Sequence, residues 1–161
     1  MATGFKLVLV PTDFSPAASS ALRTAVNVAR AFSATIELFH VDIDPSIEGQ
    51  APENPFPVRL IFQSIHAETV KRLGRLADEV RKAGVPCMTV SGFGRSSRAI
   101  VEQARASNAD LIVIGHHSDH RIGHLWLGSL TRSIVEHAPC ALLVVPYLEA
   151  AVRAQGPEAP G

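Results

Sequence analysis

The chain of 161 residues has no excess of either charge, because Lys plus Arg and Asp plus Glu number 15 each and the formal net charge is zero. A neutral chain lacks the strong field that draws in nucleic acid or an anionic membrane surface. We therefore expect neither as a partner. Any anionic ligand must be held by local dipoles and well-placed donors.

Cysteines are scarce, and the two that are present, Cys87 and Cys140, belong to no CxxC or His/Cys zinc spacing. Two cysteines are too few for a disulfide framework in a chain of this length. Each lies in apolar surroundings, which predicts buried structural thiols.

Long hydrophobic runs are also missing. Only four apolar residues separate Lys6 from Pro11, far fewer than a secretory signal needs, and no run approaches the length of a membrane span. We therefore expect a cytoplasmic protein. Its 47% hydrophobic content is enough for the core of one domain.

Short apolar runs, in contrast, recur five times and predict five strands. The first, fourth and fifth are nearly continuous in Val, Ile and Leu, which is typical of parallel strands buried on both faces. The second alternates with Glu37 and His40, which indicates a position nearer an edge. The five runs are 6–11, 35–41, 85–90, 110–115 and 141–146.

Helical patterns lie between these runs. Ser15 before Pro16 predicts a helix start, because the hydroxyl can cap free amides and proline loses no bond at the first helical position. Further helices are predicted over 59–83, ended by Gly84, over 96–107, and from Ser129 to just before Pro139. The inward face predicted for 59–83 comprises Ile61, Ile65, Val70, Leu73, Ala77 and Val80.

Strict alternation of strand and helix predicts an α/β fold, a doubly wound five-stranded parallel sheet with helices on both faces. For its strand order we take 3-2-1-4-5, which makes strands 1 and 4 neighbours. One domain should cover 1–148. The stretch 42–58 carries four prolines and no periodicity, which predicts a flexible surface loop, and the tail 149–161 is predicted to be disordered.

Ligands of such sheets bind beyond the carboxyl ends of the strands, where the strand order reverses. The segments 11–15 and 115–131 follow the two strands that meet there. Gly115 would let backbone approach a ligand closely. Gly128 and Ser129 open a helix whose free amides favour phosphate, and Thr131 adds a hydroxyl.

Other chemical motifs are weaker. His116, His117, His120 and His124 suggest a metal, but the segment contains a glycine and no cysteine, so we assign no metal site and expect a loop with His117 facing the ligand. The stretch 92–97 lacks the third glycine of a dinucleotide motif and is interpreted as a strand-to-helix turn. No P-loop, nucleophile elbow or credible catalytic triad occurs.

Four residues after the fourth predicted strand have the spacing of a known motif: Gly115, Ser118, Gly128 and Ser129. The motif is Gly, two residues, Gly, nine residues, Gly, then Ser or Thr. In this spacing the chain resembles the nucleotide-binding members of the universal stress protein family. The resemblance covers about residues 5–147 and departs at Ser118, where the family has glycine. It implies a Rossmann-like fold of the adenine nucleotide alpha hydrolase type.

The resemblance also implies roles. Asp13 would take a ribose hydroxyl or a hydrated cation, and the backbone of Val41 would meet the adenine edge. The ligand would be ATP, or AMP or ADP, with Mg²⁺ bridging its phosphates. The residues implied in binding are Pro11, Thr12, Asp13, Val41, Ile114, Gly115, His116, His117, Ser118, Gly128, Ser129, Leu130 and Thr131.

The leading hypothesis is therefore an ATP-binding regulatory module of the stress response, with slow hydrolysis at most, acting on a protein partner that the sequence does not name. An edge strand at 141–146 would pair in a homodimer. The alternatives are a dimeric scaffold that binds no nucleotide, favoured by Ser118, and an enzyme such as a nucleotidyl transferase, which would need His117 or His124 at the phosphates.

Overall fold

The computed structural model describes residues 4–42, 55–117 and 128–147. Predictions for 43–54, Ser118, His120, His124 and the tail from 148 onward fall outside these residues. The elements run in the order β1 (Leu7–Pro11), α1 (Pro16–Phe32), β2 (Thr35–Asp42), α2 (Pro55–Lys82), β3 (Cys87–Phe93), α3 (Ser96–Ala106), β4 (Leu111–His117), α4 (Ser129–His137) and β5 (Ala141–Tyr147).

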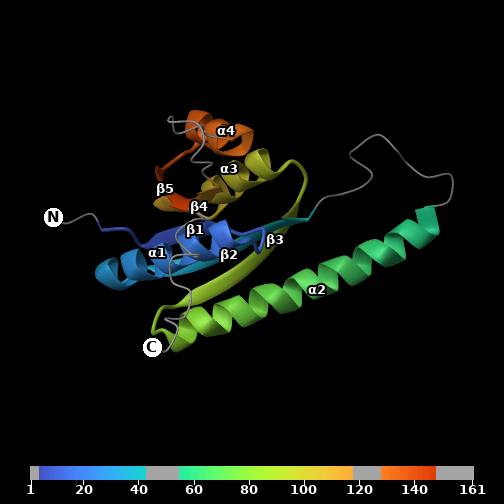
Figure 1. Cartoon of the computed structure of the whole chain (residues 1–161), viewed down its shortest axis with the longest axis horizontal. Helices are drawn as coiled ribbons and strands as arrows, with labels where there is room; N and C mark the ends of the chain where they lie inside the picture. Colours follow the sequence, from blue (N-terminus) through green and yellow to red (C-terminus); the bar gives the residue numbers. More distant parts are fainter. Residues whose placement is uncertain (1–3, 43–54, 118–127, 148–161) are drawn as a thin grey trace, which may run out of the picture.

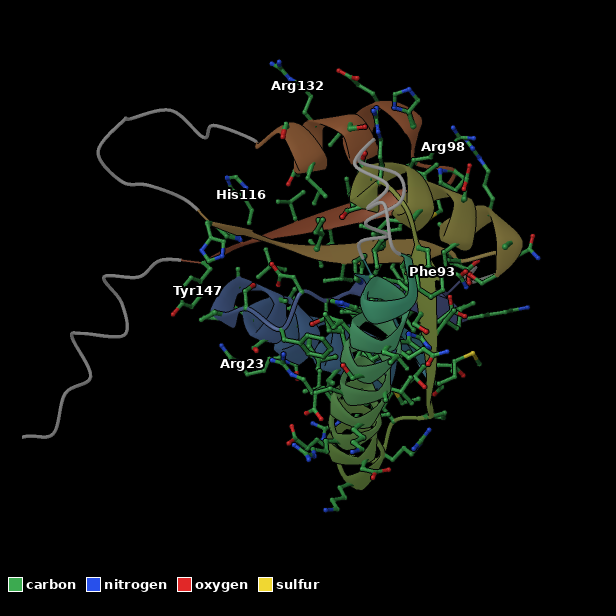
Figure 2. All side chains as sticks on the ribbon, turned by 90° about the vertical axis from the view of Figure 1, so that its right-hand side faces the viewer. Arg23, Phe93, Arg98, His116, Arg132 and Tyr147 are labelled. Carbon is green, nitrogen blue, oxygen red and sulfur yellow. The ribbon has the colours of Figure 1, made fainter. Side chains whose placement is uncertain are left out.

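The five strands form one parallel sheet in the order β3-β2-β1-β4-β5, which confirms the predicted fold class and strand order. Helices α1 and α2 lie on one face, and α3 and α4 lie on the other (Figures 1 and 2). Because β1 pairs with both β2 and β4, the strand order reverses at β1. The carboxyl ends of β1 and β4 therefore meet at one edge of the sheet.

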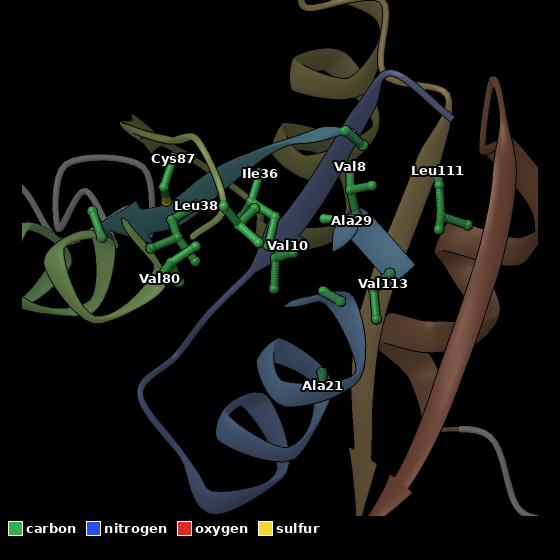
Figure 3. Close-up of a cluster of buried hydrophobic side chains, with 14 of the residues drawn as sticks. Val8, Val10, Ala21, Ala29, Ile36, Leu38, Val80, Cys87, Leu111 and Val113 are labelled. Carbon is green, nitrogen blue, oxygen red and sulfur yellow. The ribbon is translucent and has the colours of Figure 1, made fainter. Parts of the chain in front are cut away.

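The core is densest around β1, where Val8, Leu9 and Val10 are fully buried. Such continuous burial follows from helices covering both faces, as the apolar runs predicted. Figure 3 shows Ala21 and Ala29 of α1 facing the apolar side chains of the central strands. These small residues let α1 lie close to the sheet, which brings its first turn near the end of β4.

The predicted start of α1 is confirmed. The Ser15 hydroxyl accepts a hydrogen bond from the Ala18 amide at 3.2 Å, and Pro16 is the first helical residue. The predicted loop 42–58 is wrong at both ends, since Asp42 ends β2 and α2 begins at Pro55. Proline in the first turn of a helix costs no intrahelical hydrogen bond, so the prolines at this point do not exclude a helix.

The inward face predicted for α2 is half right. Leu73, Ala77 and Val80 are buried, as predicted. The side chains of Ile61, Ile65 and Val70 are each more than half exposed, so that part of the prediction is wrong. These three positions lie off the face of α2 that meets the sheet, because that face carries His66 and Thr69, which bond to Asp42 of β2.

Strand β2 lies one position in from the edge strand β3, and its polar residues have structural roles. Glu37 is buried and accepts a hydrogen bond from the Gln103 side chain of α3 at 2.8 Å. Within the described ranges, no helix is both long and apolar enough to cross a membrane.

Candidate functional site

A cavity of about 200 Å³ lies beyond the carboxyl ends of β1, β2 and β4, at the point where the strand order reverses. This is the position that the sequence predicted for a ligand. It is lined by Pro11, Thr12, Asp13, Ser15, Ala17, Ala18, Phe39, His40, Val41, Ser96, Ile100, Ile114, Gly115, His117 and Leu130.

The turn between β1 and α1 forms one wall and is held by its own polar side chains. The Thr12 hydroxyl accepts a hydrogen bond from the Phe14 amide at 3.0 Å, and the Asp13 carboxylate accepts one from the Ser15 amide at 2.9 Å. The Thr12 amide donates to the Phe39 carbonyl of β2 at 2.8 Å. The turn is therefore tied to the sheet while the Asp13 carboxylate remains exposed.

Partial burial by itself raises the pKa of Asp13, but hydrogen bonds from Ser15 and from the Asp13 amide, together with the nearby His117, outweigh it and hold the pKa below its ordinary value. The carboxylate is accordingly ionised at neutral pH. An ionised carboxylate only accepts hydrogen bonds, so it suits a sugar hydroxyl or a cation and disfavours a phosphate.

Phe14 adopts a left-handed backbone conformation, with φ of 63°, which costs roughly 1 kcal/mol or more for a residue with a side chain. Its ring lies 4.8 Å from the His40 ring, centroid to centroid. The guanidinium of Arg72, from α2, lies over the Phe14 ring, 4.0 Å from its centroid. These contacts offset the strain and hold the turn in place.

Three helix N-termini contribute to the lining: Ala17 and Ala18 from α1, Ser96 from α3 and Leu130 from α4. The first amides of a helix have no intrahelical acceptor and carry the positive end of its dipole. Among the described residues that line the cavity there is no Lys or Arg. An anion here would therefore meet main-chain amides and the ring of His117 rather than Lys or Arg.

An apolar surface faces these polar groups. Val41 lies near the end of β2, Ile114 belongs to β4, and Ile100 lies on α3. Three elements therefore supply branched aliphatic side chains to the same cavity. A flat apolar ring would bury its faces against such side chains, while main-chain groups at the end of β2 remain available to its edge.

The two motif glycines of the described residues differ in their surroundings. A Cβ on Gly115 would collide with the backbone of Ala17 and lie 2.9 Å from the Ala18 nitrogen. Gly115 thus permits the close approach of α1, a packing role beside the ligand role predicted from the sequence. A Cβ on Gly128 would meet no described residue within 4 Å, and its φ is −58°. Neither the packing of the described residues nor the backbone conformation demands glycine there.

The structure brings eight of the predicted site residues together in the cavity: Pro11, Thr12, Asp13, Val41, Ile114, Gly115, His117 and Leu130. Gly128 and Ser129 are exposed at the start of α4, outside the lining. Thr131 is buried.

His116 is also not in the lining, although it shares a face of β4 with the lining residue Ile114, and its side chain lies on the α4 side of the strand (Figure 2). Its ring is buried, and its Nε2 finds no hydrogen-bond partner among the described residues.

Seven lining residues were not predicted from the sequence: Ser15, Ala17, Ala18, Phe39, His40, Ser96 and Ile100. Ser15 was identified only as a helix cap. The small residues after it could have indicated a first turn packed near the site. Nothing local marks His40 or Ile100, because they reach the cavity only through the pairing of β2 with β1 and the placement of α3.

The fold and the position of the cavity define a class: doubly wound α/β proteins with a ligand site at the switch point of the sheet. Within that class the particular family is clear. The universal stress protein family model matches residues 4–146, so the chain belongs to this family, as the sequence motif indicated.

Individual relatives agree. Universal stress protein A homolog 1 of Coxiella burnetii is 32% identical over 142 residues, which cover 88% of this chain and 96% of that protein. The solved universal stress protein of Lactobacillus plantarum has a TM-score of 0.73 at 27% identity and covers 88% of this chain and 98% of its own. A family protein of Arabidopsis thaliana, solved with AMP bound, has a TM-score of 0.65 at 18% identity, covering 91% and 94%.

Proposed function

We propose that this chain is a regulatory module that binds an adenine nucleotide in the cavity at the ends of β1, β2 and β4. One observation carries the proposal: three helix N-termini, an ionised Asp13 and an apolar surface share one cavity. A nucleotide has the matching parts, namely an anionic tail, sugar hydroxyls and a flat apolar base.

The base would lie against Val41, Ile100 and Ile114, with the main chain of Val41 at its edge. Asp13 would accept a hydrogen bond from a ribose hydroxyl. The phosphates would lie toward Gly128 and Ser129, where the first amides of α4 are free.

Mg²⁺ fits this arrangement, since Asp13 is an exposed carboxylate at the cavity and the remaining ligands of the ion would be phosphate oxygens and water. The ion would neutralise phosphate charge that the described lining does not meet with Lys or Arg.

The AMP found in the Arabidopsis relative supports the class of ligand. ATP is our choice for this chain because no described residue lies within 4 Å of a Cβ on Gly128, so that among the described residues the site can extend beyond the cavity itself. The cavity of about 200 Å³ is below the roughly 300–1,000 Å³ of ordinary ligand pockets, so the outer phosphates would lie outside it.

A second candidate is a scaffold of the same fold that binds no nucleotide. Ser118 favours it, because this residue replaces the second glycine of the family motif.

Mass spectrometry of small molecules released from the purified protein, followed by calorimetry with ATP, ADP and AMP with and without Mg²⁺, separates the two candidates. A folded protein that releases and binds no nucleotide would support the scaffold.

The decisive variant is Gly128→Val, which places a branched side chain where the phosphates would lie and where it meets no protein atom within 4 Å. It should lower nucleotide affinity at least tenfold with little change in thermal stability. Gly74→Val is the matched control, since Gly74 in α2 also has no neighbour within 4 Å and does not line the cavity. Equal affinities of the two variants would contradict the proposed phosphate position.

We also propose a homodimer through β5, which pairs only with β4 among the described strands and so leaves an open edge. Light scattering after gel filtration should give twice the 17.2 kDa chain mass. We assign no dedicated catalysis, and turnover of Mg-ATP well above background would support the enzyme alternative.

A further inference from the structure

A cluster of buried and half-buried polar side chains lies beside the cavity, centred on Asp42, the last residue of β2. Asp42 is 3% exposed. Its Oδ2 accepts a hydrogen bond from His66 Nδ1 at 2.7 Å, and its Oδ1 accepts one from the Thr69 hydroxyl at 3.0 Å. Both donors belong to α2, so a single carboxylate joins this helix to the end of β2.

The same carboxylate also contacts His40, which is one of the residues that line the cavity. Residues two apart on a strand share one face, and His40 Nε2 lies 3.5 Å from Asp42 Oδ1. The other ring nitrogen, Nδ1, lies 2.7 Å from the Thr12 carbonyl oxygen. A carbonyl only accepts, so His40 Nδ1 must carry the hydrogen. The ring therefore holds the turn through a hydrogen bond, and it contacts the carboxylate through Nε2, an attraction that requires a second hydrogen on that nitrogen.

Thr12 begins the turn that presents Asp13, and His40 supports this turn at two points. One is the hydrogen bond to the Thr12 carbonyl. The other is the contact with the Phe14 ring, whose centroid lies 4.8 Å from that of His40. Because the backbone of Phe14 is strained, the turn depends on contacts that hold the Phe14 side chain in place, and the His40 ring supplies one of them.

We propose that Asp42 is a positioning residue: held from α2 by Thr69 and His66, it orients His40, and His40 holds the Thr12–Phe14 turn so that Asp13 faces the ligand. The ligand half of this inference rests on the proposed nucleotide site. The consequence is that residues of α2 with no place in the cavity lining affect ligand affinity.

Thr69→Val tests this coupling most directly, because the side chain keeps its shape, loses its hydroxyl and does not line the cavity. Losing one hydrogen bond to a charged group should lower affinity about three- to tenfold, as expected when part of that bond's effect reaches the site. The matched control is Thr24→Val on α1, whose hydroxyl bonds only to the Ser20 carbonyl, at 3.3 Å. It should change affinity less than about twofold.

Two further variants distinguish coupling from general damage. His66→Phe keeps a ring beside Phe93, which lies 5.6 Å away, but removes the donor to Asp42, and should resemble Thr69→Val. In an Asp42→Asn background, Thr69→Val should add little, because the two changes act through one group. Additive effects would contradict the proposal.

His40→Asn supplies the rescue. Its amide nitrogen can stand near the position of His40 Nδ1 and keep the bond to Thr12, but it is too short to reach Asp42. This variant should retain much of the affinity and lose the response to Thr69→Val. His40→Ala should lose affinity without recovery.

A ligand-free readout keeps this inference separate from the proposed function. Ring ¹⁵N shifts should show hydrogen on His40 Nδ1 in the unaltered protein, and amide hydrogen exchange at Phe14 and Ser15 should speed up in Thr69→Val but not in Thr24→Val. If no nucleotide binds while exchange responds in this way, the proposed ligand is wrong and the coupling stands. Unchanged exchange and unchanged affinity in both Thr69→Val and His66→Phe would overturn the coupling.

Discussion

Replacing Gly115 with alanine should damage the fold and the site together. The added Cβ would collide with the Ala17 carbonyl group and lie 2.9 Å from the Ala18 nitrogen. All three atoms are backbone atoms in the first turn of α1, so none can rotate away as a side chain could. The helix must shift, or β4 must bend at its end.

Overpacking of this kind costs about 1–3 kcal/mol, and the rigid backbone partners favour the upper half of that range. For a domain of this size each kcal/mol lowers the melting temperature by roughly 2–4 °C, so the expected decrease is roughly 4–12 °C. Because Ala17 and Ala18 also line the cavity, ligand affinity should fall as α1 moves.

Differential scanning calorimetry measures the first effect, and calorimetric titration with nucleotide measures the second. Gly128→Ala is the matched control for the fold, because its Cβ meets nothing within 4 Å. It should cost only a few tenths of a kcal/mol as a weaker helix cap. A Gly115→Ala protein with the original melting temperature would refute the packing argument and leave Gly115 with a ligand role alone.

Two further predictions concern residues away from the cavity. Burial raises the pKa of the Cys87 thiol to about 11, so a thiol reagent should modify the less buried Cys140 first and Cys87 only on unfolding. Peptide mass spectrometry after labelling measures this order. Fast labelling of both thiols in the folded protein would contradict the prediction. The Asp110 carboxylate accepts hydrogen bonds from the amides of Leu7 and Lys6, which hold its pKa below the ordinary value. Its stabilising effect is therefore present above the unfolded pKa near 3.8 and is lost as pH falls through the folded value. Asp110→Asn should cost about 0.5–1 kcal/mol in urea unfolding at pH 7, and nothing near pH 2.

Much of the fold follows from local patterns. Continuous Val, Ile and Leu runs marked strands buried on both faces, Ser15 before Pro16 marked the start of α1, and the alternation of elements predicted a parallel sheet with helices on both faces. These signals are local because periodicity and capping depend on residues a few positions apart.

The candidate site was predicted in part, by rules that act over longer distances. The switch-point rule predicted that the segments 11–15 and 115–131 flank one crevice, and Asp13, Gly115 and His117 do line the same cavity. Ile114 and His116 came from the family resemblance, and of the two only Ile114 is in the lining; neither route pointed to His40. A motif names positions along the chain, whereas the packing of strands and helices decides which of those side chains reach the cavity.

The amino-acid sequence by itself determined the five strands, the caps, the family and the edge of the sheet at which a ligand would bind. Only the tertiary structure decided that three helix N-termini share one cavity, which face of α2 lies against the sheet, and that Asp42 joins α2 to His40. The physical reason is that these features arise between segments distant along the chain. Their contacts depend on strand pairing and helix placement, which no local pattern of residues records.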